Sequence, residues 1–498
     1  MGIVQTSSLR SSILLGIGII LGFLTAGILL PNYLTEEQNG LLTLFNSYSL
    51  IYSQIAILGI HTAVIKFFPH FRNASNKHNS FLTNISLVLF ISFLIFLVYY
   101  YITKPYLKNW FSTSPLFDKN YFYIIPFTFC TLYFYLFDAY STAQAKSVRG
   151  FFLKDVLQRI FILVVIVLFI LFQLNFDVFI FLYCIAFCLP TVFFGGILLY
   201  EKQFTLTPKW YDLYSKNWKY MSKVAGYSML LGISWVGISN LDAIIIERML
   251  DLKQAGIYGR NMFFAILVTV PYRAIHKIAS GVISNSFKDG NLDNIRDVYY
   301  KSTMTQTIIG LFILCGLWIN IDNIYHVIPE SYESGKYVIL FIGLGNLSTM
   351  IGGVNTAVIS YSPYYKWNTI FVAILVVLVI SCTIIFIPWW GITGAALAVG
   401  VSTFFYNLMM YLLLYIKYKF QPFNAKHLWV IVIGLGAYFI GRVIPAIQAS
   451  FILDILIRSS VFTIIFGGGI LITKVSPDIN KMSSGLIKNL FQVFSPKK

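Results

Sequence analysis

Long runs of apolar residues are the feature that most constrains this chain. A run of about 20 such residues crosses the hydrocarbon core of a bilayer as a helix, because backbone groups in lipid must form their hydrogen bonds within the segment. With 58% hydrophobic and only 11% charged residues, the chain has too little charge to cover a water-soluble surface. The sequence predicts an all-α integral membrane protein with about 14 spans, at residues 12–34, 42–66, 81–102, 121–142, 153–173, 177–200, 220–245, 255–285, 303–321, 335–360, 367–388, 392–417, 427–444 and 450–473.

The positions of lysine and arginine indicate how these helices are oriented. If the N-terminus lies in the cytoplasm, 24 of the 36 Lys and Arg residues fall in inner segments and only 7 in outer loops. Basic residues concentrate on the cytoplasmic side of membrane proteins, so we expect both termini to be cytoplasmic. This topology and attraction to anionic membrane lipids explain the net charge of +17, and no nucleic-acid partner is expected.

A weak internal repeat divides the chain. The stretches "YLTEEQNGL" (33–41) and "MLDLKQAGI" (249–257) share Leu, Gln and Gly at a constant offset of 216, and each lies between the first and second helices of a set of six. The repeat predicts two lobes of parallel sense. They are an N-lobe at 1–200 and a C-lobe at 220–420, with a cytoplasmic interfacial linker at 201–219 and two extra helices with a basic amphipathic tail at 421–498.

Small and aromatic residues meet in "IPWWGITGAALAVGVSTFF" (387–405). Trp389 and Trp390 fall in an outer connection, where tryptophan suits the headgroup layer. Ala396 and Gly400, like Gly394 and Ala398, are small residues four apart, which predicts the close approach of a neighbouring helix.

Three stretches carry a resemblance to a known family: "LLPNYLTEEQNGLLTLFNSY", "SNLDAIIIERMLDLKQAGIYG" and "FIPWWGITGAALAVGVSTFF". Over about residues 8–420 the chain resembles the polysaccharide biosynthesis (O-antigen-type) flippases of the multidrug/oligosaccharidyl-lipid/polysaccharide (MOP) exporter superfamily. The resemblance implies a MATE-like fold of two six-helix lobes. It also implies a carrier in the bacterial inner membrane that moves an undecaprenyl-diphosphate-linked oligosaccharide to the outer leaflet by alternating access, for surface polysaccharides such as lipopolysaccharide. The polysaccharide polymerase machinery is an implied partner.

The eighth apolar segment, "GIYGRNMFFAILVTVPYRAIHKIAS", contains Arg260, Arg273 and Lys277. A diphosphate can cross hydrocarbon only in a solvated cavity with inward-facing cations, and arginine suits phosphate because it binds two oxygens at once. These three residues therefore form the predicted substrate-binding wall. The alternative is that Arg260 and Lys277 extend their charges to the two membrane surfaces.

Four further polar residues are candidates for coupling or for lining the cavity. Asp138 and Asp242 either pair with an arginine, bind a coupling cation or make structural contacts. His61 either titrates, coupling transport to protons, or packs with one hydrogen bond. Arg159 follows Asp155 by four residues, as Arg458 follows Asp454, so local ion pairs are expected.

Nothing in the sequence indicates catalysis, a metal or a cofactor. It has neither a Gly-x-x-x-x-Gly-Lys-Ser/Thr nucleotide loop nor a His-Glu-x-x-His zinc motif, and its five cysteines lie in apolar runs. A lipid-carrier-dependent polysaccharide polymerase or glycosyltransferase is one alternative, which short outer loops disfavour. A MATE-type drug or cation antiporter is the other, and it would favour carboxylates over the clustered cations seen here.

Overall fold

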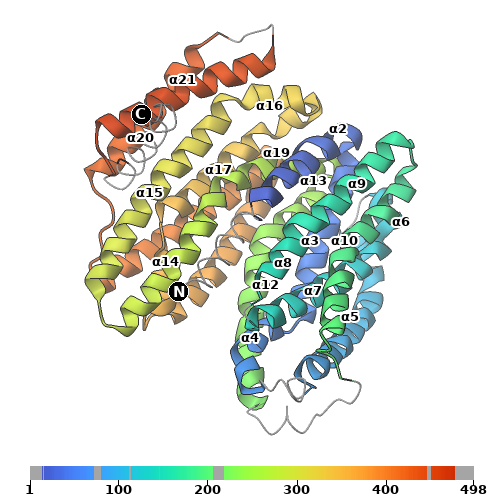
Figure 1. Cartoon of the computed structure of the whole chain (residues 1–498). Helices are drawn as coiled ribbons and strands as arrows, with labels where there is room; N and C mark the ends of the chain where they lie inside the picture. The colour runs from blue at the N-terminus through green and yellow to red at the C-terminus, as the bar shows by residue number, and fades with distance from the viewer. Residues whose placement is uncertain are drawn as a thin grey trace, which may run out of the picture. The chain divides into compact units, whose positions relative to one another are not determined.

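The computed structural model is helical throughout the part of the chain that it describes, which is residues 14, 16–71, 80–111, 114–144, 146–205, 218–445, 450–476 and 480 (Figure 1). Within these residues eleven helices are long and apolar enough to cross a membrane, or twelve if the bent pair Glu36–Ala56 and Ile60–Phe68 forms one span. The predicted all-α membrane architecture is confirmed, while the count of fourteen stays a prediction. Most of the predicted linker and the amphipathic tail lie outside the described residues.

One predicted break and one predicted segment can be compared with the helices observed. The segments at 367–388 and 392–417 both fall in the range labelled α19 (Lys366–Tyr418), but they are two helices with a kink between them at Gly391, whose φ of 56° and ψ of −136° are not helical and suit a residue without a Cβ. The segment at 153–173 is not one regular α-helix, because it begins within the π-helix η4 (Phe152–Leu157) and continues as α9 (Gln158–Leu171), with α8 (Val148–Phe151) preceding it.

The contacts of the chain divide it into two compact units, 1–260 with 383–392, and 261–382 with 393–498. This division places α12 with the first unit, whereas the repeat assigns it to the C-lobe; the lobe boundaries stay a prediction. The other elements of unit 1 are η1 (Phe23–Leu29), α2 (Leu30–Tyr33), α3 (Glu36–Ala56), α4 (Ile60–Phe71), α5 (Phe81–Phe111), α6 (Pro115–Asn120), η3 (Tyr121–Tyr123), α7 (Ile124–Ala143), α10 (Phe176–Tyr200), α12 (Trp218–Met249) and most of α13 (Leu252–Ile266).

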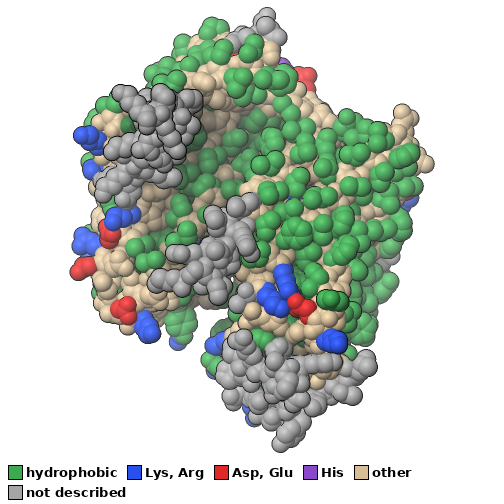
Figure 2. Space-filling model, viewed as in Figure 1, with side chains coloured by type: hydrophobic (Ala, Val, Ile, Leu, Met, Phe, Trp, Pro, Cys, Tyr) green, Lys and Arg blue, Asp and Glu red, His purple; other side chains and the backbone are tan. Residues whose placement is uncertain are grey.

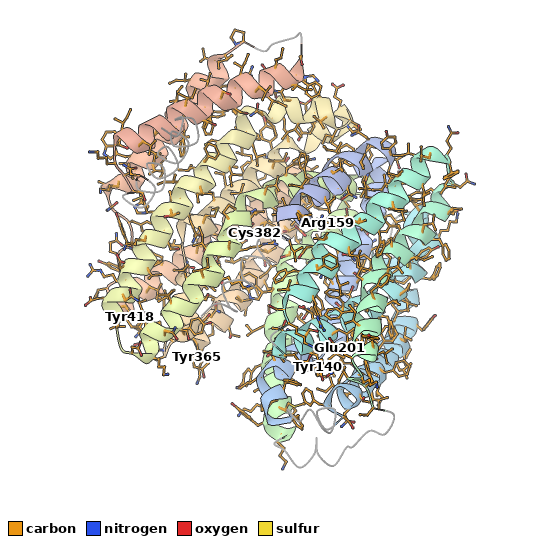
Figure 3. All side chains as sticks on the ribbon, in the orientation of Figure 1. Tyr140, Arg159, Glu201, Tyr365, Cys382 and Tyr418 are labelled. Carbon is orange, nitrogen blue, oxygen red and sulfur yellow. The ribbon has the colours of Figure 1, made fainter. Side chains whose placement is uncertain are left out.

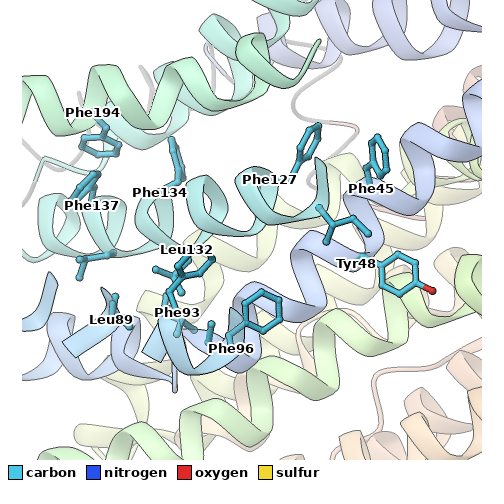
Figure 4. Packing of buried hydrophobic residues seen from close by; sticks show 14 of the residues in the cluster. Phe45, Tyr48, Leu89, Phe93, Phe96, Phe127, Leu132, Phe134, Phe137 and Phe194 are labelled. Carbon is cyan, nitrogen blue, oxygen red and sulfur yellow. The ribbon is translucent and has the colours of Figure 1, made fainter. Parts of the chain in front are cut away.

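Helix α7 lies at the centre of unit 1 and packs against α3, α4 and α10. Aromatic rings fill the space between them, as Figure 4 shows for Phe45, Phe127, Phe134 and Phe194. The ring centroids of Phe45 and Phe127 are 5.6 Å apart, and those of Phe134 and Phe194 are also 5.6 Å apart in an edge-to-face arrangement. These ring contacts pack α7 against both α3 and α10.

The stretch "YLTEEQNGL" is the start of a helix. The hydroxyl of Thr35 accepts a hydrogen bond from the backbone N–H of Gln38, whose side chain accepts one from the backbone N–H of Thr35. This capping box satisfies two donors that a helix start leaves unpaired, and Glu36 and Glu37 complement the positive end of the helix dipole. The chain therefore ends α2 and begins α3 within a few residues.

The two repeat-related glycines contact each other's segments reciprocally. A Cβ on Gly40 would stand 2.0 Å from the carbonyl oxygen of Leu252, and a Cβ on Gly256 would stand 2.0 Å from the carbonyl oxygen of Glu36. Residues 252 and 256 follow residues 36 and 40 by the offset of 216. Equivalent positions of the repeat thus meet face to face, and only glycine lets the two backbones approach this closely.

Unit 2 is built around α15, which packs against α14, α17 and α20. Within the terminal helix α21, Arg458 and Asp454 form a buried ion pair at 2.7 Å. Asn323 donates to the same carboxylate at 2.6 Å and thereby links α21 to the segment Ile321–Val327. The expected local pair is confirmed here. The elements of this unit are the end of α13, η5 (Leu267–Thr269), α14 (Val270–Lys288), α15 (Leu292–Ile319), α16 (Ile321–Val327), η6 (Glu330–Gly335), α17 (Lys336–Ile351), α18 (Asn355–Tyr361), most of α19, α20 (Ala425–Val443) and α21 (Phe451–Ile472).

The surface of the helices is apolar, as a membrane requires. Hydrophobic side chains cover the visible face of α9 and α10 in Figure 2, where charged side chains are few. Trp389 and Trp390 are 69% and 51% exposed, as headgroup-facing residues should be. The predicted close packing is confirmed at Gly400, where an added Cβ would stand 2.5 Å from the carbonyl oxygen of Phe341 on α17.

Candidate functional site

Two arginines approach one tyrosine inside unit 1. Tyr183 of α10 is 5% exposed, and its hydroxyl shares a hydrogen bond with the side chain of Asn46 on α3. Arg260 of α13 and Arg159 of α9 are both close enough to interact electrostatically with this hydroxyl. Four helices therefore bring two cations and two neutral polar groups together inside the helix bundle. We call Arg159, Arg260, Tyr183 and Asn46 the arginine cluster.

Arg159 is held against the first span, Gly16–Tyr33. A Cβ on Gly22 would stand 1.9 Å from a terminal nitrogen of the Arg159 guanidinium, and one on Gly18 would stand 2.7 Å from the carbonyl oxygen of Asp155. The glycines leave the space that the guanidinium occupies. Figure 3 labels Arg159 on α9, where the side chain is partly buried. The expected ion pair with Asp155 stays a prediction.

Arg260 is almost entirely buried, with 8% of its surface exposed. Its Nη1 donates to the carbonyl oxygen of Ala26 at 3.3 Å. Ala26 lies in the π-helix η1, and π-helical turns are rare features that recur at functional sites. Placing an arginine at the centre of a membrane helix costs about 3 kcal/mol on insertion scales. The presence of Arg260 in this segment therefore indicates that it binds a polar or charged group.

Arg273 and Lys277 share one face of α14 in unit 2. Both are exposed, and the Arg273 side chain makes no hydrogen bond or ion pair with the described part of the chain. A 3₁₀ turn, η5, separates α13 from α14 directly before Pro271. The eighth segment is therefore two helices, with Arg260 on one and Arg273 and Lys277 on the other. That these three residues form one substrate-binding wall stays a prediction.

The other sequence candidates lie in three separate places of unit 1. Asp242 is buried and accepts hydrogen bonds from the hydroxyl of Tyr258 and from the backbone N–H of Ala243. His61 is partly buried on α4, and its Nδ1 has no hydrogen-bond partner among the described residues. Asp138 lies on α7 against Gly150. Hence neither Asp242 nor His61 is seen to join the arginine cluster.

A charged cluster that sequence reasoning missed lies where α7, α8 and α10 of unit 1 meet. The carboxylate of Glu201 accepts two hydrogen bonds from Arg149, at 2.6 and 3.0 Å, and two from Lys146, both at 3.2 Å. Beside it the hydroxyl of Tyr140 donates to Gln203 at 2.8 Å (Figure 3). The cluster fastens the turn between α7 and α8 to the end of α10.

The hydrogen bonds from Arg149 are the main reason that the pKa of Glu201 falls from 4.5 to about 2, with Lys146 contributing and partial burial opposing. In the sequence Lys146 and Arg149 indicated only an inner loop. Tyr183 and Asn46 carried no signal at all, because tyrosines and asparagines with ordinary packing roles are common in the chain.

Comparison with known proteins identifies the class to which this fold belongs. The structure is similar to a solved structure described as the lipid II flippase MurJ in an inward closed conformation, with a TM-score of 0.71 and 16% identity over 92% of this chain and 98% of that one. It is also similar to an inward-facing multidrug resistance MATE family transporter of the MOP superfamily (TM-score 0.62, 12% identity, 81% and 97% covered). A Vibrio cholerae MATE transporter, VcmN, gives a TM-score of 0.58 with 10% identity over 83% and 97%.

This is the fold of the MOP-superfamily transporters, as the sequence predicted. The model of the polysaccharide biosynthesis protein family matches residues 8–283, which is more than half of the chain. The protein belongs to the polysaccharide biosynthesis protein family. No curated protein matches the sequence.

Proposed function

We propose that this protein is a flippase that moves an undecaprenyl-diphosphate-linked oligosaccharide from the inner to the outer leaflet of the bacterial inner membrane. The arginine cluster of unit 1 is the observation that carries the proposal. A diphosphate needs cations in a place from which lipid is excluded, and Arg260 with Arg159 supplies two of them beside a buried hydroxyl.

The chemistry of the cluster suits a phosphorylated headgroup. Guanidinium groups bind phosphate oxygens in pairs and keep their charge in a low dielectric. The Tyr183 hydroxyl and the Asn46 amide add neutral groups that bond to phosphate or sugar oxygens. The bound headgroup would replace the carbonyl of Ala26 as the partner of Arg260.

Arg273 and Lys277 extend the proposed path. Both are exposed on α14 and four residues apart, so they present two cations to a ligand that approaches this face of unit 2. In the proposed alternating access between the N-lobe and the C-lobe, the diphosphate moves between the two groups of cations. Asp138, Asp242 and His61 are the proposed coupling residues.

Two other proposals follow from the resemblance and the topology. Both termini are cytoplasmic in the proposed orientation, and the polysaccharide polymerase machinery is the proposed recipient of the delivered oligosaccharide. Membrane lipids, with their anionic headgroups, surround the basic inner segments.

A drug or cation antiporter of MATE type is the second candidate, and one observation favours it. Asp138 is a carboxylate without a hydrogen bond from the described residues, and such a group could attract an organic cation. Two arginines beside one tyrosine in unit 1 favour an anion instead.

The test follows the lipid-linked oligosaccharide in a deletion strain that carries plasmid-borne variants. Accumulation of labelled lipid-linked oligosaccharide in the inner leaflet supports the flippase, and unpolymerised units outside would indicate a polymerase. We expect Arg273→Ala to abolish surface polysaccharide and Arg273→Lys to retain part of it, since lysine keeps the charge but loses the paired hydrogen bonds. Wild-type surface polymer in Arg273→Ala at matched expression would remove this residue from the path.

A further inference from the structure

Asp138 is a carboxylate within a membrane span. It lies within the span Pro115–Ala143, near the inner end of α7, and makes no hydrogen bond or ion pair with the part of the chain that the structure describes. Its Oδ1 would stand 1.8 Å from a Cβ on Gly150, so the carboxylate lies directly on the backbone of α8. A charged carboxylate in this place is costly, and a protonated one is not.

The charged groups near Asp138 are Lys154 and Asp155, both in the π-helix η4. The ammonium of Lys154 forms no ion pair with a carboxylate of the described residues. It lies over the ring of Tyr135 at 4.7 Å and over that of Phe134 at 5.5 Å, both on the same helix as Asp138. In the part of the chain that the structure describes, the Asp138 carboxylate and the Lys154 ammonium therefore lie near each other without forming an ion pair.

The π-helix η4 connects this place to the arginine cluster. Residue Asp155 of η4 packs its backbone on Gly18 of the first span, and one turn later Arg159 packs its guanidinium on Gly22. A π-helical turn has one residue more than the α-helix accommodates, and such turns are where helices change register at functional sites. A displacement of Lys154 and η4 would therefore also displace Arg159, which lies directly after η4 on α9.

We propose that Asp138 binds and releases the proton to which transport is coupled, and that its charge switches the position of η4; this rests on the flippase function proposed above. When Asp138 loses its proton, the carboxylate attracts the Lys154 ammonium away from the rings of Phe134 and Tyr135. When it gains a proton, Lys154 returns to the rings.

The first test needs no substrate. Purified protein in lipid is stepped between acidic and alkaline pH, and the infrared difference spectrum is recorded in the carboxylic-acid C=O region. We expect a band that is lost in Asp138→Asn and shifted in Asp138→Glu. Asp177→Asn is the matched control, because that carboxylate lies at the outer end of α10 in an exposed pair with Lys119. A wild-type spectrum without this band, or a band retained in Asp138→Asn, would overturn the proton site.

The second test reports on η4. A fluorophore is placed at the exposed position 152 by Phe152→Cys in a background whose five cysteines are alanine. The pH step should shift its emission, and both Asp138→Asn and Lys154→Met should abolish the shift. An emission shift that persists in Asp138→Asn would contradict the proposal that the charge of Asp138 switches the position of η4, even if the infrared band is lost.

The third test separates the proposal from the flippase function. In proteoliposomes, an imposed pH gradient should change the translocation rate of a lipid-linked oligosaccharide in the wild type and in Asp177→Asn, and the rate in Asp138→Asn should not respond. If the wild-type protein translocates no substrate, the flippase proposal fails, whereas the infrared band and the emission shift still decide the proton switch. A gradient response retained in Asp138→Asn contradicts the coupling role.

Discussion

At the scale of single residues, glycine decides where the charged groups of unit 1 lie. Gly22 and Gly150 leave the space that the Arg159 guanidinium and the Asp138 carboxylate occupy, since a Cβ at either position would overlap them at 1.9 and 1.8 Å. The buried Arg260 instead donates a hydrogen bond to a backbone carbonyl of η1. These charged groups thus lie directly against backbone atoms. Replacing Gly22 or Gly150 even by alanine should therefore have a large effect.

Arg260 offers the most direct test of the arginine cluster. Arg260→Ala should lower binding of a soluble diphosphate headgroup analogue about tenfold or more, because a hydrogen bond to a charged group contributes about 1.5–3 kcal/mol. Arg260→Lys should recover part of the loss. Arg248→Ala, at the exposed end of α12, is the matched control and should bind as the wild type does. Calorimetry in detergent measures all three, and equal affinity in Arg260→Ala and the wild type would contradict the role.

Glu201 makes stability depend on pH in a defined direction. Its pKa is lower in the folded protein, at about 2, than the ordinary 4.5, so the ion-paired cluster stabilises the fold above about pH 4.5 and this contribution is lost as the pH falls toward 2. Glu201→Gln should therefore melt at a lower temperature than the wild type at pH 7. The gap should shrink as the pH falls from about 4.5 toward 2. A gap that does not change with pH would mean that the glutamate acts by packing alone.

At the scale of helices, the contact of α3 with α13 depends on two glycines. Gly40 and Gly256 face the carbonyl oxygens of Leu252 and Glu36 in a reciprocal arrangement. A methyl group at either position would stand 2.0 Å from a carbonyl oxygen, far inside van der Waals contact. The helices would have to separate at this end.

Gly256→Ala should therefore lower the melting temperature and reduce surface polysaccharide, and Gly40→Ala should do the same because the contact is reciprocal. Gly281→Ala on α14 is the control, since a Cβ there meets nothing within 4 Å. Thermal unfolding in detergent and surface-polymer staining measure the two effects. A Gly256→Ala variant as stable and active as Gly281→Ala would show that the two helices are not held together in the membrane.

At the scale of the whole molecule, the arrangement of the helices establishes the class of protein, whereas the number of membrane crossings stays a prediction. Eleven or twelve spans meet the length and hydropathy test in the described residues. The fifth predicted segment does not meet it, because a π-helix interrupts its start, and the range Lys366–Tyr418 counts once although Gly391 separates the eleventh predicted segment from the twelfth. Fourteen crossings with both termini inside would follow if each predicted segment spans the membrane.

Reporter fusions test this topology directly. We expect green fluorescent protein to fluoresce when fused after residue 498 or before residue 1, and alkaline phosphatase to be active when inserted near residue 118 or residue 390. An active alkaline phosphatase fused after residue 498 would require an odd number of crossings. One of the fourteen predicted spans would then have to be given up.

The sequence by itself determined the all-α membrane fold, the superfamily and the sign of the embedded charges. Apolar length, the bias of Lys and Arg and the motif around Gly256 are local properties of the chain, and the bilayer forces the rest because backbone groups in lipid must pair within helices. Only the tertiary structure decided which charges meet. Asn46 lies far along the chain from both arginines, and Tyr183 lies far from Arg260. Their contacts arise from the packing of α3, α9, α10 and α13, and the contact of Asp138 with Gly150 arises where the chain turns from α7 to α8; no periodicity records these contacts.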